Sequence, residues 1–273
     1  MTLSGADIAA LLSAHGLRPS KALGQNFVAD PNTVRRIARL AGVGPDSRVL
    51  EIGAGLGSLT LALAETGAAV VAVEADRHLV PVLRTVVEPA GVEVVEGDAR
   101  TLDLGALVAE HGGGEWDLVA NLPYNVATPL VIRILTDVTA VTRLLVMVQR
   151  EVGERMAAAA GDDAYGAVSV RVAYFARAEV VGRVPASVFV PRPRVESVLV
   201  RLVRRPAPAV DPALVSYQRL DTVVRAGFAQ RRKMLRRSLA GVVDPEAFDR
   251  AAVRPDARAE ELDVAAWGRL AAR

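Results

Sequence analysis

The chain has 273 residues, 51% of them hydrophobic, and a formal net charge of +2 at pH 7. This length exceeds one average domain, and the composition supports a sizeable core and excludes a disordered chain. The absence of cysteine excludes disulfides, thiolate zinc sites and cysteine nucleophiles, and three scattered histidines argue against a histidine-based metal site.

The sequence does not predict a membrane-spanning segment. Its apolar runs are too short to cross a bilayer, and the first residues, MTLSGADIAA, lack the basic and then apolar regions of a signal peptide. We therefore expect a cytoplasmic protein that has no membrane partner and binds no metal.

The N-terminal part is expected to be helical and then to be interrupted by proline and glycine. SGADIAALLSAHG has amphipathic spacing, and LRPSKALGQNFVADP follows it. Asp30 and Pro31 have the pattern of an N-cap followed by proline at the first helical position, which predicts that a helix begins here and continues through NTVRRIARLAG.

From Arg48 onward, strand-like runs alternate with helical stretches. The β-rich runs are RVLEI, AVVAVE, VEVVEG, WDLVAN and RLLVMV, and the helical stretches are SLTLALAET, RHLVPVLRTVV and TPLVIRILTD. Short apolar strands that alternate with helices indicate a parallel sheet covered on both faces. The predicted fold class is therefore α/β, with a doubly wound, Rossmann-like sheet that binds ligands at the carboxyl ends of its strands.

The last quarter of the chain has a different pattern. After one more strand-like run, SVLVRL, the segment RRPAPAVDP is expected to be a linker, and three segments with helical spacing follow. We predict an α/β domain over residues 1–205, which includes the N-terminal helical extension, and a small all-helical domain over residues 206–273. Residues 201–237 carry ten lysine or arginine side chains and two acidic ones, a local charge of +8 that indicates a polyanionic partner.

The stretch VLEIGAGLGSLT places Gly53, Gly55 and Gly57 at a strand-to-helix turn. Glycines there let the backbone approach a ligand closely, although a tight turn without a ligand has the same pattern. The dinucleotide-binding fingerprint requires glycine at position 58, where this chain has Ser58. The spacing Glu-x-Gly-x-Gly-x-Gly resembles instead the first motif of S-adenosylmethionine-dependent methyltransferases.

Two acidic residues end the next two β-rich runs and support an adenosine-containing ligand. Glu74 can accept the ribose hydroxyls, and Asp98 can accept a hydrogen bond from the adenine amino group. Either residue alone would more simply be a solvated loop carboxylate. Glu51, inside the strand before the glycines, is expected to orient the pocket rather than to touch the ligand.

The stretch ANLPYNVATP follows the fourth β-rich run and carries polar and aromatic groups to the same edge of the sheet. An adenine amine is a poor nucleophile because its lone pair is delocalised into the ring. The side-chain oxygen of Asn121 and the carbonyl oxygen of Leu122 can accept hydrogen bonds from the N–H groups of this amine, and Pro123 fixes the spacing of the two acceptors. Tyr124 offers a ring on which an extruded base can stack. The alternative is a turn closed by the asparagine side chain, with Tyr124 packed against it.

Eight segments together carry a resemblance to a known family. In order they are LGQNFVAD, EIGAGLGSLT, VEAD, EGDA, NLPYNVATP, AYGAVSV, VFVPRPRVESVLV and FAQRRKMLRRSL. Over about residues 21–240, the chain resembles the ribosomal RNA adenine dimethyltransferases, and most closely the bacterial small-subunit type. The resemblance implies S-adenosyl-L-methionine as cofactor and N6,N6-dimethylation of two adjacent adenines in a hairpin loop near the 3′ end of 16S rRNA. It also implies a 30S ribosomal subunit or its precursor as partner and a monomer when free.

The resemblance assigns roles to individual residues. It implies that Asn26 and Val28 line the cofactor pocket and that Gly53 lies under the methionine part of the cofactor. It implies that Glu74 binds the ribose of the cofactor and that Asp98 binds its adenine. It places Asn121 between the cofactor and the target amine. The residues that it implies for catalysis are Asn121, Leu122, Pro123, Tyr124 and Phe189.

One of these assignments departs from the plain family pattern, and another has an alternative explanation. Most relatives have leucine where Val28 stands, a mild change for a backbone contact. Phe189 is a second candidate surface for stacking the adenine, although packing in the core explains it almost as well. The family's basic C-terminal segment corresponds to QRRKMLRR, which makes Arg231, Arg232, Lys233, Arg236 and Arg237 the expected RNA-binding residues.

Three other functions are open to a chain of this kind. The related macrolide-resistance enzymes methylate an adenine of 23S rRNA, but NLPYN, AYGAVSV and QRRKMLRRSL favour the small-subunit type. A non-catalytic ribosome assembly factor could keep the fold without the chemistry, and intact Gly53, Glu74, Asp98 and Asn121 argue against it. A nicotinamide-dependent oxidoreductase is disfavoured by Ser58.

Overall fold

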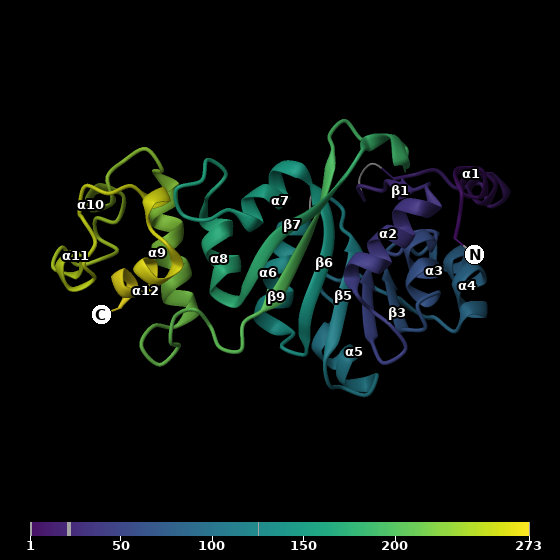
Figure 1. Ribbon diagram of the computed structural model, residues 1–273, viewed down its shortest axis with the longest axis horizontal. Helices are drawn as coiled ribbons and strands as arrows, with labels where there is room; N and C mark the ends of the chain where they lie inside the picture. Colours follow the sequence, from purple (N-terminus) through teal and green to yellow (C-terminus); the bar gives the residue numbers. More distant parts are fainter. Residues whose placement is uncertain (1, 21–22, 125, 273) are drawn as a thin grey trace. The chain divides into compact units, whose positions relative to one another are not determined.

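The computed structural model describes residues 2–20, 23–124 and 126–272 (Figure 1). The chain divides into two compact units, each assembled from two separate stretches of sequence. Unit 1 comprises Met1–Gly153 and Val180–Val203, and unit 2 comprises Glu154–Glu179 and Arg204–Arg273.

This division differs from the single boundary expected at residues 205 and 206. That boundary lies close to the third crossing between the units, at residues 203 and 204, but the chain also enters unit 2 once before it and then returns to unit 1. The stretch Glu154–Glu179 belongs to unit 2 because Tyr165, Val170 and Tyr174 are buried in the apolar core of that unit. Burial is decided by contacts with distant segments, so a boundary placed from local composition misses such an excursion.

Unit 1 contains most of a seven-stranded sheet, of which only residues 176–179 and 204 belong to unit 2. The strand order from one edge is β4 (Glu93–Glu96), β3 (Ala69–Glu74), β2 (Arg48–Ile52), β5 (Trp116–Asn121), β6 (Val141–Gln149), β9 (Ser197–Arg204) and β7 (Ala176–Val184). The strands from β4 to β6 in this order are parallel, and β9 runs antiparallel to β6. The predicted doubly wound, Rossmann-like sheet is confirmed.

The order of the strands creates one position suited to a ligand. The chain moves outward from β2 through β3 to β4 and then begins again on the other side of β2 with β5. At such a reversal, the connections after the two central strands turn to opposite faces and leave a crevice at the carboxyl ends. Gly53 follows β2 and Asn121 ends β5, so both lie at this crevice.

Helices cover both faces of the sheet. The helices of unit 1 are α1 (Gly5–Ala14), α2 (Pro31–Ala41), α3 (Ser58–Ala64), α4 (Val80–Val87), α5 (Leu104–Glu110) and α6 (Ala127–Asp137), with the 3-10 turns η1 (Glu88–Ala90) and η2 (Ala186–Val188). Helix α7 (Arg150–Ala157) begins in unit 1 and ends in unit 2. Apolar residues of α2, α3 and α4 share one core with alternate residues of β2, β3, β5 and β6. Right-handed crossovers then place α5 and α6 on the opposite face.

The segment before β2 is held by local caps and by a short strand pair. Ser4 and Asp7 form a capping box at α1, and Asp30 accepts from the backbone of Asn32 and Thr33 at the start of α2, as its sequence predicts. Between these helices, β1 (Phe27–Val28) pairs antiparallel with β8 (Phe189–Val190). This pairing fixes the N-terminal segment to unit 1.

Unit 2 is a helical cluster around Trp267, whose side chain is fully buried. Its elements are α8 (Ala167–Phe175), α9 (Tyr217–Ala229), α10 (Leu235–Ser238), α11 (Ala247–Arg250), η3 (Ala259–Glu261) and α12 (Val264–Ala271). Gly227 of α9 allows a close approach, because a Cβ there would lie 2.4 Å from the Trp267 ring. Throughout the described part of the chain, no helix is long and apolar enough to cross a membrane.

The predicted strands and helices of unit 1 are found, whereas one segment of unit 2 differs from its prediction. QRRKMLRRSLAG was expected to be helical, but only Leu235–Ser238 is α-helical and residues 231–234 form a turn. The backbone N–H of Leu235 donates to Ala257 and that of Arg236 to Pro255, so these groups do not bond within a helix. The sequence patterns did not assign α5, α7, α8 or β7.

The tight turn before α3 yields a test of this fold. Gly57 has φ of +90°, and a Cβ there would lie 2.5 Å from Cγ1 of the buried Val87. Gly57→Ala should lower the free energy of unfolding of unit 1 by about 2–4 kcal/mol, since backbone strain and overpacking add. Urea unfolding followed through Trp116, in a Trp267→Phe background, measures this change.

Gly42→Ala is the matched control. Gly42 also has a positive φ, +67°, but a Cβ there would have no neighbour within 4 Å. Its replacement should cost only the backbone strain, about 1–2 kcal/mol. Equal losses for the two variants would show that the contact with Val87 contributes nothing.

Candidate functional site

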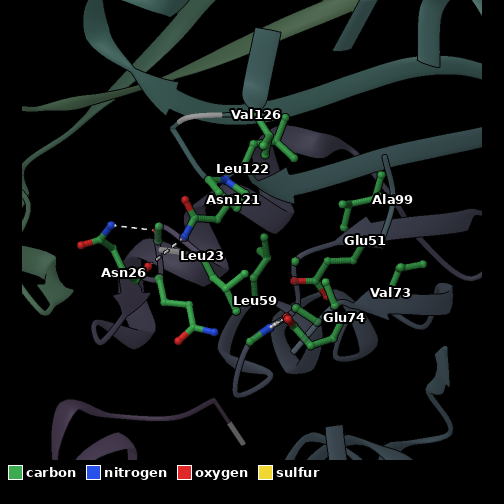
Figure 2. Close-up of a pocket in the computed structure, with 18 of the residues that line it drawn as sticks. Leu23, Asn26, Glu51, Leu59, Val73, Glu74, Ala99, Asn121, Leu122 and Val126 are labelled. Carbon is green, nitrogen blue, oxygen red and sulfur yellow. Dashed lines mark hydrogen bonds between the residues drawn. The ribbon is translucent and has the colours of Figure 1, made fainter. Parts of the chain in front are cut away.

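A pocket opens at the carboxyl ends of β2, β3, β4 and β5, within unit 1 (Figure 2). It contains about 1190 Å³ of free space, counted to its open mouth. Four turns and the N-terminal segment line it: residues 23–28, 51–56 with 58 and 59, 73–75, 97–100, and 121–124 with 126 and 130. Of the predicted site residues, the structure brings Asn26, Val28, Gly53, Glu74, Asp98, Asn121, Leu122, Pro123 and Tyr124 together here.

The glycine turn after β2 makes room for the turn after β5. Gly53 has φ of +74°, and a Cβ there would lie 3.8 Å from the Asn121 carbonyl oxygen and from Cδ of Pro123. Gly55 has φ of +61°, and a Cβ there would lie 3.0 Å from the ring of Phe27. Glycine at these positions therefore permits both the backbone conformation and the close approach of three chain segments around the pocket.

Glu74 is a buried carboxylate that the backbone already orients. It is 6% exposed, and its two oxygens accept from the N–H groups of Gly55 and Asp76, each at 2.8 Å. Burial raises the pKa of Glu74, and these backbone hydrogen bonds oppose the rise. Because a carboxylate has about four acceptor positions, Glu74 retains two for a ligand with a pair of hydroxyls.

Asp98 lies at the pocket but is already occupied by a neighbouring cation. The Arg100 guanidinium donates from Nε to both oxygens at 3.0 and 2.9 Å and from Nη2 at 2.5 Å, and the Arg100 backbone N–H donates at 2.9 Å. The hydrogen bonds from Arg100 hold the pKa of Asp98 below its ordinary value. These contacts use the acceptor positions of Asp98, so an adenine amino group must displace Arg100 to reach it.

Glu51 is the least compensated acid at the pocket. It is 1% exposed, and its Oε2 has no hydrogen-bond partner among the described residues. Burial raises the pKa of Glu51 to about 8, and the nearby charge of Glu74 adds to the rise. The side-chain hydroxyl of Thr60 opposes the rise, but the buried Oε2 keeps no partner, so the ionised carboxylate would be stabilised by a cation that a ligand brings.

The side-chain amide of Asn121 has a fixed orientation. Its Nδ2 donates to the carbonyl oxygen of Asn26 at 3.0 Å, and the Asn26 side chain donates in turn to the Gly24 carbonyl at 3.1 Å (Figure 2). Since the branch that faces a carbonyl must be the NH₂ group, the other branch of Asn121 is an oxygen and can only accept. The orientation in which the Asn121 oxygen is free to accept is therefore fixed by Asn26, which lies 95 positions earlier in the chain.

The rest of the motif is held from both sides. The N–H of Leu122 donates to Met147 at 3.1 Å, and the Pro123 carbonyl accepts from Val126 and Ala127 at the start of α6. The Tyr124 hydroxyl bonds to the buried Ser197 of β9 at 2.9 Å, which anchors the ring at its outer end. Asn125, the last residue of NLPYN, lies outside the described residues.

Phe189 is not among the residues that line the pocket. It is 3% exposed and packs in the core shared with Val28 and Leu199, as the alternative reading of this residue expected. Its backbone pairs with Val28 in the β1–β8 ribbon. Phe189 therefore supports a pocket-lining strand from behind and presents no stacking surface in this structure.

The predicted RNA-binding residues lie in unit 2, and they are not equivalent. Arg231 donates to Glu260 at 2.7 Å and to the Asp163 carbonyl at 3.0 Å, so it links the turn to its own unit. Arg232, Lys233, Arg236 and Arg237 are exposed. These four are better placed to meet an external polyanion than Arg231 is.

The sequence patterns missed two groups at the pocket. Arg100 stands two residues after Asp98, and this spacing could have suggested their ion pair. Ser197 is 73 positions from Tyr124, and nothing in the sequence connects them. Among the described residues, no group of three or more histidine or acidic side chains is arranged to hold a metal ion.

The pocket fits S-adenosylmethionine in its donor and acceptor chemistry. Glu74 retains acceptors for two ribose hydroxyls, and Asp98 stands one strand away for an adenine amino group. The Oε2 atom of Glu51, which has no hydrogen-bond partner among the described residues, suits a ligand that carries a sulfonium and an ammonium group. The glycine turn lets such a ligand lie close to the backbone.

Comparison with known proteins gives consistent results. The sequence model of the family described as ribosomal RNA adenine dimethylase matches residues 16–273. Proteins named ribosomal RNA small subunit methyltransferase A are 46% identical in Cutibacterium acnes, over 98% of this chain and 93% of theirs, and 45% identical in Thermobifida fusca, over 98% and 95%. The protein of that name from Bifidobacterium adolescentis is 44% identical, over 96% and 90%.

Two solved structures share the fold. The 23S rRNA methyltransferase ErmE superposes with a TM-score of 0.70 at 26% identity, over 90% of this chain and 98% of its own. A dimethyladenosine transferase from Plasmodium falciparum superposes with a TM-score of 0.73 at 23% identity, over 88% and 94%.

The raised pKa of Glu51 predicts that cofactor binding depends on pH. With a pKa of about 8, Glu51 is mostly protonated at pH 7, and a cationic ligand favours its ionised form. The affinity for S-adenosylmethionine should therefore increase as the pH rises from 6 to 8, with release of about one proton at pH 7. Calorimetry in buffers of different ionisation heat measures the protons released.

Glu51→Gln should bind more weakly and lose this dependence on pH, whereas Glu110→Gln, at an exposed position, should behave as the wild type. Binding without proton release in the wild type would contradict the assignment, because it would mean that Glu51 has the same protonation state in the free protein and in the complex.

The Asp98–Arg100 ion pair predicts a variant with stronger cofactor binding. Arg100 is 61% exposed and competes with the ligand for Asp98, and exposed ion pairs contribute about 0.2–1 kcal/mol. Arg100→Gln should therefore increase the affinity for S-adenosylhomocysteine by about two- to fivefold, measured by calorimetry. Arg84→Gln removes a comparable exposed pair with Glu88 and should leave the affinity unchanged. Weaker binding of the Arg100 variant would mean that Arg100 assists the ligand.

Proposed function

The chain belongs to the ribosomal RNA adenine dimethylase family, and from that premise we propose that it dimethylates N6 of two adjacent adenines in a hairpin loop near the 3′ end of 16S rRNA. It is an S-adenosylmethionine-dependent methyltransferase with a Rossmann-like fold. The observation that best supports the reaction is the orientation of Asn121, whose amide presents an acceptor oxygen at the cofactor pocket.

We assign the cofactor to the residues gathered at the carboxyl edge of the sheet. S-adenosylmethionine supplies an electrophilic methyl group when bound. Glu74 accepts hydrogen bonds from the ribose hydroxyls, and Gly53 lets the methionine part lie against the backbone. Asp98 accepts a hydrogen bond from the adenine amino group after Arg100 moves aside. Asn26 and Val28 close the pocket from the N-terminal segment, and Asn26 also positions Asn121.

The same edge can prepare an adenine amine for methylation. The Asn121 oxygen and the Leu122 carbonyl accept its two N–H bonds, which draws the nitrogen towards tetrahedral geometry and stabilises the positive charge that develops on it. Pro123 keeps these acceptors at a fixed spacing, and Tyr124, anchored through Ser197, offers a ring for stacking. No strong general base is needed, because the amine proton becomes acidic once the nitrogen carries a fourth substituent.

The proposed partner is 16S rRNA within a 30S subunit or its precursor. The relatives that are 44–46% identical are named for the small ribosomal subunit, and they align over at least 90% of their length. Arg232, Lys233, Arg236 and Arg237 of unit 2 would neutralise phosphates, while Arg231 would hold the turn that presents them. We expect the free protein to be a monomer without bound metal and, because ribosomal subunits are its substrate, to be cytoplasmic.

Methylation of 23S rRNA is the second candidate, since ErmE shares the fold over most of its length. The test is to map N6-methylated adenines in both rRNAs from cells with and without the gene, by primer extension and mass spectrometry. We expect two adjacent dimethyladenines to disappear from 16S rRNA in the deletion strain and to return with the wild-type gene. Loss of a modification from 23S rRNA instead would refute the proposal.

Asn121→Ala should separate catalysis from binding. It removes one transition-state acceptor and no basic contact, so methyl transfer to unmethylated 30S subunits should fall by at least about a hundredfold. Binding of the variant to those subunits should stay within about twofold, and Asn32→Ala, at an exposed position on α2, should retain full activity. A non-catalytic assembly factor would instead show no transfer even in the wild type.

A further inference from the structure

The loop of residues 190–196, VPRPRVE, is fastened at both ends to residues of the pocket. At its start, Val190 pairs with Phe27 in the β1–β8 ribbon, and Phe27 lines the pocket. At its end, Ser197 is fully buried and bonds to the Tyr124 hydroxyl at 2.9 Å. The loop therefore lies beside the part of the pocket where Tyr124 stands.

Two cations in this loop have no partner. Arg192 and Arg194 are exposed, and in the described ranges neither makes a hydrogen bond or an ion pair. The one acid of the loop, Glu196, is paired with Arg150 at 3.5 Å. Two like charges two residues apart repel each other in the free protein, and an anionic partner would relieve this repulsion.

The loop also exposes apolar surface and resists rearrangement. Val190 is 38% exposed and Val195 is 44% exposed, on either side of the two arginines. Pro191 and Pro193 restrict the backbone between them and carry no N–H group. Its basic and apolar side chains are thus held in place and remain without internal partners.

We propose that the 190–196 loop binds the RNA backbone next to the adenine that enters the pocket. Arg192 and Arg194 would contact phosphates of the splayed strand, and Val190 and Val195 would lie against its riboses or bases. This inference rests on the proposed function and adds a contact in unit 1 that is separate from the basic turn of unit 2. This contact would hold the RNA directly beside the nucleotide that is methylated.

The test measures RNA binding without requiring the native substrate. A fluorescein-labelled 12-nucleotide oligouridylate is titrated with the full chain at 50–200 mM KCl, and anisotropy is recorded. Arg192→Gln/Arg194→Gln should bind about tenfold more weakly at 100 mM KCl. The slope of log affinity against log salt should become shallower by about 1.4, since each phosphate contact on a single strand contributes about 0.7.

The controls separate a local contact from general loss of charge or of folding. Arg39→Gln removes an exposed arginine on α2 beside Leu40, which lies with Asp117 at the opposite edge of the sheet. This variant should match the wild type in affinity and slope within error. The double variant should keep the wild-type melting temperature and affinity for S-adenosylhomocysteine.

Each outcome decides the inference. An unchanged salt slope in the double variant, or equal losses in the double variant and the Arg39 control, overturns it. Loss of binding to 30S subunits with unchanged oligouridylate binding also overturns it, because the loop would then contact protein. Failure of the wild type to methylate 30S subunits, with the oligouridylate effect intact, refutes the proposed function and leaves the RNA contact standing.

Discussion

The site depends on one hydrogen bond, from Nδ2 of Asn121 to the carbonyl oxygen of Asn26. An asparagine side chain can present either a donor or an acceptor, and only one choice serves an amine that must give up its N–H bonds. By occupying the donor branch, Asn26 makes that choice before any ligand arrives. In the proposed reaction, the N-terminal segment is thereby part of the reacting centre, although it stands outside the seven-stranded sheet.

Electrostatics explain why the pocket suits a cationic ligand. Three carboxyl groups surround it, and each is compensated differently. Glu74 is held by backbone N–H groups, Asp98 by Arg100, and Glu51 by neutralisation through its raised pKa. A positively charged ligand would favour the ionised form of Glu51 and be attracted by it, whereas a neutral nucleoside would leave Glu51 protonated.

The sequence predicted those parts of the site that follow from local pattern. Strand ends after apolar runs placed Gly53, Glu74, Asp98 and Asn121 at one edge, because parallel strands in a doubly wound sheet share their carboxyl ends. The N-terminal residues of the pocket, Asn26 and Val28, came only from family resemblance.

What the sequence could not predict depends on tertiary contacts between distant residues. The Tyr124–Ser197 bond and the burial of Phe189 are set by the pairing of β1 with β8 and by the position of β9. In unit 2, the backbone bonds to Pro255 and Ala257 override the helical spacing of the basic segment. The charge and periodicity of one segment do not indicate which distant residues it will bond to or pack against.

The excursion of Glu154–Glu179 constrains how this protein could have been assembled in evolution. Unit 2 is not a tail that a single recombination event could append or exchange, because part of its core is encoded upstream of β7 and β9. A gene fusion at the linker after β9 would leave Tyr165, Val170 and Tyr174 without their apolar partners. Exchange of the helical unit between relatives therefore requires three coordinated breakpoints, which favours inheritance of both units together.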